Sequence, residues 1–223
     1  MRTLATLVIM LGLAGPGFAG EVEIDASRSV FAVVTHKGGL AAGQAHNHLV
    51  VADGSKAELS FDPKAPLDAA FALEVAVTDL VVDDSEKQKT WYPRLEELGI
   101  LDEPFGDVSE KDRAKIRKAM LSDKQLDAKA FPRIKARVTK VAEEPSTVGG
   151  VKMPYAVTLE IEVHGKKAEK QVAARFEKAD GVLTIEAAGS FQFSDFGIKP
   201  YSAALGMVKN QDEFHVFLHL QAE

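Results

Sequence analysis

The feature that most constrains the fold is a two-residue alternation of apolar and polar side chains in the C-terminal half. From residue 155 to residue 163 every second side chain is apolar, and those between them are mostly polar or small. Residues 183–193 and 214–220 repeat this pattern. Because successive side chains of a β-strand point to opposite faces, each run predicts a strand with one buried face.

Short turn sequences separate these runs. His164-Gly165 and Asp180-Gly181 stand where a chain would reverse between two strands, and Asp-Gly is a strong hairpin signal. The N-terminal half contains similar but less regular runs, so the chain should hold about eight to ten strands. The spacing predicts an all-β protein, an antiparallel sandwich or barrel, rather than a parallel sheet.

Residues 83–130 interrupt the strand pattern with helix signals. A proline and a glycine bracket a short helix at residues 93–99. Ser109 begins a capping-box sequence, which predicts a second helix from Lys111 to Leu121. We expect this insertion to lie at one end of the barrel as a lid or plug. Its expected inward side chains are Ile116, Ala119 and Met120.

The first 19 residues have the pattern of a secretory signal peptide. Arg2 supplies a positive charge, an apolar run follows from residue 4 to residue 13, and small residues precede Gly20. The run is too short to span a bilayer, and nothing amphipathic follows it, which argues against a buried N-terminal helix. We therefore expect cleavage after Ala19, a single domain over residues 20–223, and a periplasmic protein without stable membrane insertion.

Composition excludes several classes of function. The formal net charge of −6 argues against nucleic acid as a partner, because that interaction needs clustered Lys and Arg. The absence of cysteine excludes disulfides, thiolate metal sites and thiol nucleophiles. The chain also lacks a nucleophile elbow and a phosphate-binding glycine loop. We expect no catalytic residue and no cofactor, and we read Asp83 and Asp84 as a solvated loop rather than a weak cation site.

Several short blocks, taken in order along the chain, resemble those of the YceI-like family. The blocks are Ile24-Asp25 with Ser29, Asp112-Arg113, Leu126 to Phe131 followed by Pro132-Arg133-Ile134, Val163-His164-Gly165-Lys166, Asp195-Phe196-Gly197-Ile198, and Lys199 to Gly206. Ala45-His46-Asn47-His48 also resembles the (A/G)H(D/N)H motif of one branch. The likeness extends from about Glu21 to the end of the chain.

The resemblance implies a lipocalin-like antiparallel β-barrel, extended in this family, with an elongated apolar pocket. It also implies an exported bacterial protein that binds a polyisoprenoid, a quinone-like lipid or a similar amphiphile, and that is not an enzyme. A homodimer is compatible with the family analogy.

Strand parity then gives the candidate ligand-binding residues, for which a filled core is the alternative. These residues are Phe31, Phe61, Phe71, Leu73, Tyr155, Val157, Leu159, Phe191, Phe193 and Phe214, joined by His46 and His48 at the pocket edge.

The histidine pair has three interpretations. In a strand, His46 and His48 would project from the same face, since residues two apart share a face. They could be structural, could line the pocket and orient a head group, or could ligate a metal or haem. In the last case the third ligand would be His36, Asp53 or an acidic residue of the insertion. If the pair ligates a metal or haem, the alternative function is that of a redox or stress protein. His215 and His219 fall on the polar face of the last strand, where we expect solvent.

Overall fold

The computed structural model describes residues 22–53 and 55–222, so the predicted signal peptide lies outside the described residues. Within these described residues, eleven strands and two α-helices follow one another. They are β1 (Val30–Gly38), β2 (His48–Ala52), β3 (Lys56–Ser60), β4 (Ala70–Ala76), β5 (Leu80–Val82), α1 (Ser85–Glu97), α2 (Glu110–Met120), β6 (Arg133–Val148), β7 (Val151–Val163), β8 (Lys166–Ala179), β9 (Val182–Gln192), β10 (Ser202–Ala203) and β11 (Val208–Ala222).

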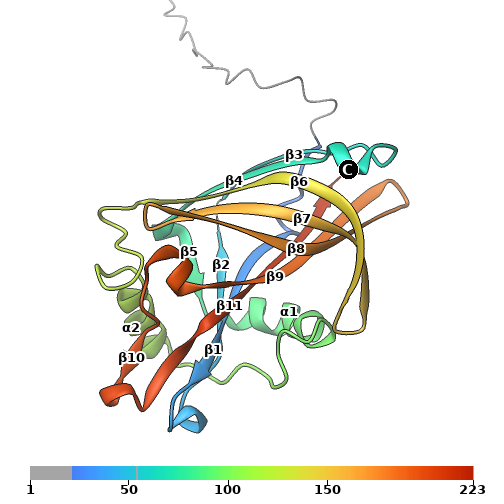
Figure 1. Ribbon diagram of the computed structural model, residues 1–223. Helices are drawn as coiled ribbons and strands as arrows, with labels where there is room; N and C mark the ends of the chain where they lie inside the picture. The colour runs from blue at the N-terminus through green and yellow to red at the C-terminus, as the bar shows by residue number, and fades with distance from the viewer. Residues whose placement is uncertain (1–21, 54, 223) are drawn as a thin grey trace, which may run out of the picture.

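All the strands belong to one antiparallel sheet, which curls around an interior (Figure 1). Its hydrogen-bonded path runs β3-β4-β6-β7-β8-β9-β11-β1-β2-β5, with β10 paired to β11. Strand β4, which is next to one end of the path, and β5 at the other end are joined by side chains, because Val75 and Leu80 share one apolar cluster with Leu73 and Met120. The expected all-β, lipocalin-like architecture is confirmed.

The long strands β7, β8 and β9 are joined by the two-residue turns that the sequence predicts. Val163 pairs with Lys166 and Ala179 with Val182, so each loop contains two residues. His164 and Asp180 have positive φ angles, as do the glycines that follow them. Two successive positive φ angles define the turn whose twist matches the flanking strands, which fixes the strand register.

The two helices lie between β5 and β6. The second begins as predicted, with the Ser109 hydroxyl accepting a hydrogen bond from the backbone N–H of Asp112 at 3.2 Å. The first is longer than predicted. It begins at Ser85, because the Asp84 carboxylate accepts from two backbone N–H groups and so caps the helix. Pro93 therefore lies inside α1 rather than at its start.

The first helix ends where the sequence predicts, at a glycine. Gly99 has a φ of +65°, and the N–H of Ile100 bonds the carbonyl of Leu95 at 2.9 Å, which is the pairing of a Schellman motif. The tip of the β6–β7 hairpin bends around the barrel to reach this end of α1 (Figure 1). A Cβ on Gly149 would lie 2.1 Å from the carbonyl oxygen of Glu97, so only glycine permits this approach.

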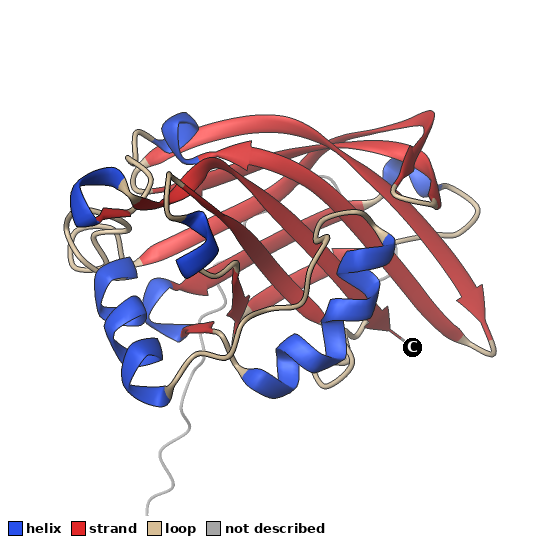
Figure 2. Cartoon of the chain, turned by 90° about the horizontal axis from the view of Figure 1, so that it is seen from below, coloured by secondary structure: helices blue, strands red, loops and turns tan. Residues whose placement is uncertain are grey.

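Besides the apolar interior of the curled sheet, a second apolar core lies between α1 and the outer face of the sheet. Leu95 of α1 and Leu98, which directly follows the helix, are buried against Val34, Leu49 and Phe217 of three strands. Figure 2 shows α1 lying across these strands. The outer face of β1, β2 and β11 is therefore covered beneath α1, and the wall of the barrel is buried on both sides there.

Candidate functional site

The interior of the curled sheet contains a cavity of about 550 Å³. Apolar side chains from most of the strands line it, and α2 contributes Ile116, Ala119 and Met120 as predicted. The size falls within the range of small-molecule pockets, roughly 300–1,000 Å³. The interior is therefore not a filled core.

Most of the residues chosen by strand parity line this cavity. They are Phe31, Phe61, Phe71, Leu73, Tyr155, Val157, Leu159, Phe193 and Phe214, together with His48. On β1, the alternate residues Phe31, Val33 and Thr35 all line the cavity. Because a strand rises about 3.3 Å per residue, the first and last of these lie roughly 13 Å apart, so the lining extends at least this far along β1.

Phe191 faces inward but does not line the cavity. It is 1% exposed and stacks on Phe196 and Phe214, with ring centroids 6.1 and 6.2 Å away. The short helical turn Phe193–Phe196 folds Phe196 over it. Phe191 is therefore part of the packed core beside the cavity, and its assignment as a pocket residue is wrong.

His46 does not project with His48. Strand β2 begins only at His48, and the alternation rule does not apply before a strand starts. His46 is exposed, beside Gly106, where an added Cβ would come within 2.0 Å of its Nδ1. The buried member of the segment is Asn47, whose side-chain oxygen accepts from the N–H of Lys37 at 3.0 Å.

The histidines of the metal hypothesis are also dispersed. His36 Nε2 lies 2.8 Å from His215 Nδ1, whereas His48 is bonded to Asp83. Burial lowers the pKa of both rings, and the neighbouring imidazole lowers that of His36 further. His215 is therefore half-buried rather than solvated. Within residues 22–53 and 55–222, no cluster of three His, Cys, Asp or Glu side chains could hold a metal ion.

His48 is held at the cavity wall by a carboxylate that the sequence reading placed in solvent. Its Nδ1 lies 2.7 Å from Asp83 Oδ2, and the Asp83 side chain is fully buried. The other Asp83 oxygen accepts from the N–H of Leu49 at 3.0 Å and from the Gln88 side-chain amide at 3.1 Å. The sequence contained a signal for the burial of Asp83, because this residue lies between an apolar strand and the N-cap of α1.

Thr35 lies directly opposite His48 in the β1–β2 register and also lines the cavity. It is 6% exposed, and its Oγ1 is the one buried side-chain polar atom without a hydrogen-bond partner in the part of the chain that the structure describes. Directly opposed residues share a face, with Cβ atoms about 5 Å apart. Thr35 and His48 thus form a polar corner, and a lone threonine at an inward position was the sequence signal for it.

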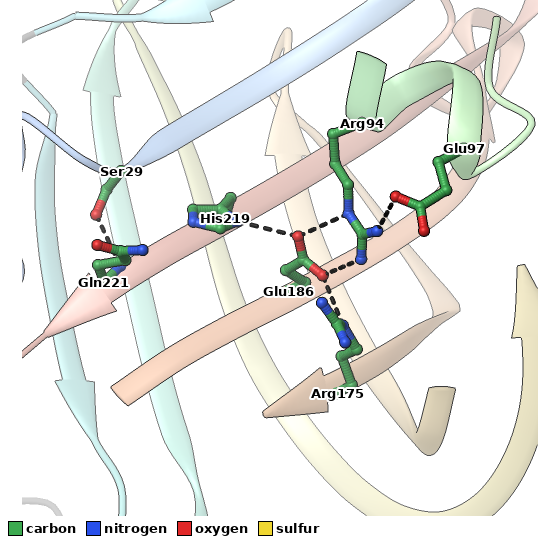
Figure 3. A network of polar contacts seen from close by, with 7 residues as sticks. All are labelled: Ser29, Arg94, Glu97, Arg175, Glu186, His219 and Gln221. Carbon is green, nitrogen blue, oxygen red and sulfur yellow. Dashed lines mark hydrogen bonds and ion pairs between the residues drawn. The ribbon is translucent and has the colours of Figure 1, made fainter. Parts of the chain in front are cut away.

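A second buried carboxylate lies outside the barrel, under α1 (Figure 3). Glu186 of β9 accepts hydrogen bonds from Arg94 of α1 at 2.9 Å and from Arg175 of β8 at 2.6 Å. His219 Nδ1 lies 3.0 Å from the same carboxylate, and Trp91 packs against the His219 ring at a tilt, with ring centroids 5.0 Å apart. The expectation of a solvated His219 is wrong, because α1 covers it.

Hydrogen bonding sets the charge of this cluster. Burial by itself would raise the pKa of Glu186, but the bonds from His219, Arg94 and Arg175 outweigh it and lower the pKa to about 2. The cluster joins α1 to three strands and uses both carboxylate oxygens. Its role is structural: Glu186, Arg94 and His219 are outside the cavity lining, and Arg175 is the one member that reaches it.

Comparison with known proteins identifies the family. The YceI-like domain model matches residues 22–222, so the chain belongs to the YceI-like family. The solved structure of BcnA from Burkholderia cenocepacia is similar, with 16% identity, a TM-score of 0.60, and coverage of 90% of this chain and 100% of that one. A mutant YCEI protein from Campylobacter jejuni has 10% identity, a TM-score of 0.51, and coverage of 78% and 84%. These likenesses show the fold.

A polyisoprenoid binding domain from Saccharophagus degradans has 8% identity, a TM-score of 0.49, and coverage of 90% of this chain and 96% of that one. No curated protein matches the chain. Among the described residues, none of the helices combines the length and the apolar character needed to cross a membrane.

Proposed function

We propose that this member of the YceI-like family is an exported, non-catalytic carrier that holds one elongated apolar molecule inside its curled sheet. The observation that carries the proposal is the cavity of about 550 Å³ with its mostly apolar lining. Side chains around an empty space lose dispersion contacts, and an apolar ligand would restore them. Each ligand methylene that leaves water contributes roughly 0.8 kcal/mol.

The proposed ligand class is a polyisoprenoid, a quinone-like lipid or an amphiphile of similar shape. Among the lining aromatic side chains, Phe31, Phe61 and Phe71 belong to one apolar cluster, and Phe193 and Phe214 belong to another. A ligand that touches both groups must be long and narrow. α2 covers part of this space through Ile116 and Met120, so it is the element that we propose to move when ligand enters.

Export belongs to the same proposal. Removal of residues 1–19 would release residues 20–223 as one domain, with its helical insertion at residues 83–130, into the periplasm. A possible homodimer is left to measurement of the mass in solution.

The test is to purify the protein from its source without detergent, extract it with organic solvent and identify the extract by mass spectrometry. We expect a long apolar molecule in near-stoichiometric amount. An Ala136→Phe variant, which fills the cavity from β6, should retain at least about tenfold less of it. Ala142→Phe is the matched control on the same strand, because Ala142 is outside the cavity lining.

Two results would contradict the carrier function. One is an empty extract combined with no uptake of an added long-chain polyprenol. The other is equal retention by the two folded variants, which would place the ligand elsewhere.

A further inference from the structure

The polar corner of the cavity has hydrogen-bonding capacity that the protein does not use. The Thr35 hydroxyl can donate one hydrogen bond and accept others, and its Oγ1 has no partner among the described residues. Buried polar groups in folded proteins nearly always have a partner, and an exception calls for an explanation. Thr35 lines the cavity, but its Oγ1 is covered by neighbouring atoms, so a ligand head group would supply the missing partner by displacing them as it enters the corner.

The neighbouring imidazole has a defined orientation. A carboxylate only accepts hydrogen bonds, so Asp83 requires the ring proton of His48 to be on Nδ1. In the neutral ring Nε2 then carries the lone pair and acts as an acceptor. The corner thus offers one hydroxyl donor from β1 and one imidazole acceptor from β2, on strands that are paired at these two residues.

We propose that Thr35 and His48 bind the head group of the ligand, and that this head group is an uncharged hydroxyl on an apolar chain. The inference rests on the proposed carrier function. A hydroxyl would donate to His48 Nε2 and accept from the Thr35 hydroxyl, which satisfies both groups at once. A carbonyl or an ether could accept from Thr35 but would leave Nε2 without a donor. The head therefore belongs to a polyprenol or to a prenylated hydroquinone, which share this chemistry.

The surrounding charges also favour a neutral head. The buried Asp83 carboxylate behind His48 would repel an anion such as a phosphate. Among the described residues, three charged side chains line the cavity, and each has an ionic partner. Lys115 and Asp112 of α2 pair with each other at 2.7 Å, and Arg175 pairs with Glu186 at 2.6 Å. Arg113 donates to the backbone oxygen of Asp83 at 3.1 Å, so this guanidinium nitrogen is already engaged and is not free to bind an anionic head group.

The experiment compares three probes with the same chain: geranylgeraniol, its methyl ether and its monophosphate. Equilibrium dialysis against the delipidated wild-type protein should give an affinity for the alcohol about tenfold above those of the other two. Thr35→Val keeps the shape of the side chain but removes the hydroxyl, and it should cut that preference to below about threefold. Thr35→Ser retains a hydroxyl and should restore the preference.

A prenylated hydroquinone and its oxidised quinone form a second pair of probes. Preference for the reduced form over the quinone supports the same hydroxyl recognition. Whichever of the hydroquinone and geranylgeraniol binds more tightly identifies the class of lipid that supplies the head group.

The failures are distinguishable. If none of the probes binds to the wild-type protein, the carrier function fails. If the probes bind but the alcohol and its ether bind equally, or the monophosphate binds most tightly, the head-group assignment is overturned while the carrier function stands. Equal preference in the wild type and Thr35→Val would also overturn it.

Discussion

Asp83 and Glu186 are two carboxylates buried to the same extent, each 2% exposed, and each bonded to a histidine. Around Glu186, two arginines and His219 use both oxygens, so the cluster closes on itself. Around Asp83, the carboxylate is also satisfied, but its histidine lines the cavity beside the unpartnered Thr35 hydroxyl. The comparison teaches that burial of a charge does not define its role. The two groups differ in whether every polar atom has a partner. All have one around Glu186, whereas the Thr35 hydroxyl beside His48 has none.

The largest effect on the free energy of unfolding should come from removing the carboxylate at the centre of the Glu186 cluster. Glu186→Ala leaves Arg94 and Arg175 without their buried partner, which should lower the free energy of unfolding by about 3–5 kcal/mol. Urea unfolding measures this. The control is Glu160→Gln, which removes a carboxylate paired with Arg137 and Lys167 on the surface. An equal loss of stability in the two variants would show that the Glu186 cluster is no more than a surface ion pair.

Acid should break the same cluster by titration. The pKa of Glu186 falls from its ordinary value of 4.5 to about 2 in the folded protein, so its stabilisation is complete above pH 4.5 and is lost as the pH falls toward 2. The loss should amount to roughly 3 kcal/mol. Urea midpoints between pH 6 and pH 2 test this. Glu186→Gln should lack this part of the acid dependence, and an unchanged slope in that variant would assign it to other groups.

Asp83→Asn should affect ligand preference more than stability. The amide can donate to His48 Nδ1, which moves the ring proton to Nε2 and turns the acceptor in the corner into a donor. We expect a loss of about 1–2 kcal/mol in unfolding free energy, because charge-assisted bonds become neutral ones. We also expect the quinone to bind better than the hydroquinone. Calorimetric titration with both forms measures the reversal, and a folded variant that still prefers the hydroquinone would show that Asp83 does not set the tautomer.

The smallest effect should be a gain. In the ligand-free protein, Thr35→Val removes a buried hydroxyl that has no partner, so it should raise the unfolding free energy by about 0.5–1 kcal/mol. Thr35→Ser keeps the hydroxyl and should not show the gain. Thermal unfolding of the delipidated proteins provides the measurement. A destabilised valine variant would mean that the hydroxyl already has a partner in the empty protein.

The sequence predicted what depends on neighbours along the chain. Strand parity placed Phe31, Leu73 and Tyr155 on the cavity wall because alternation is a local property of an extended backbone. It failed for His46, since the pattern does not show where β2 begins. It failed for Phe191 because a turn later in the chain folds Phe196 over it.

The sequence did not predict the two carboxylate clusters, because their members are distant in the chain. Arg94 and Glu186 are 92 residues apart, and His48 and Asp83 are 35 residues apart. The polar face of β9 and β11 was assigned to solvent on the pattern alone. The same alternation results whether water or a helix covers that face, so only the packing of α1 distinguishes the two cases.

The thin wall between the two cores has a practical consequence. Trp91 of α1 packs on Phe217 at 5.7 Å, and the residues on either side of Phe217, Val216 and Leu218, line the cavity. The chain has a single tryptophan, so its ultraviolet emission comes from one indole that is separated from the cavity by one strand. We therefore expect ligand entry to change the emission of the unmodified protein, and a fluorescence titration with ligand would measure this without a label.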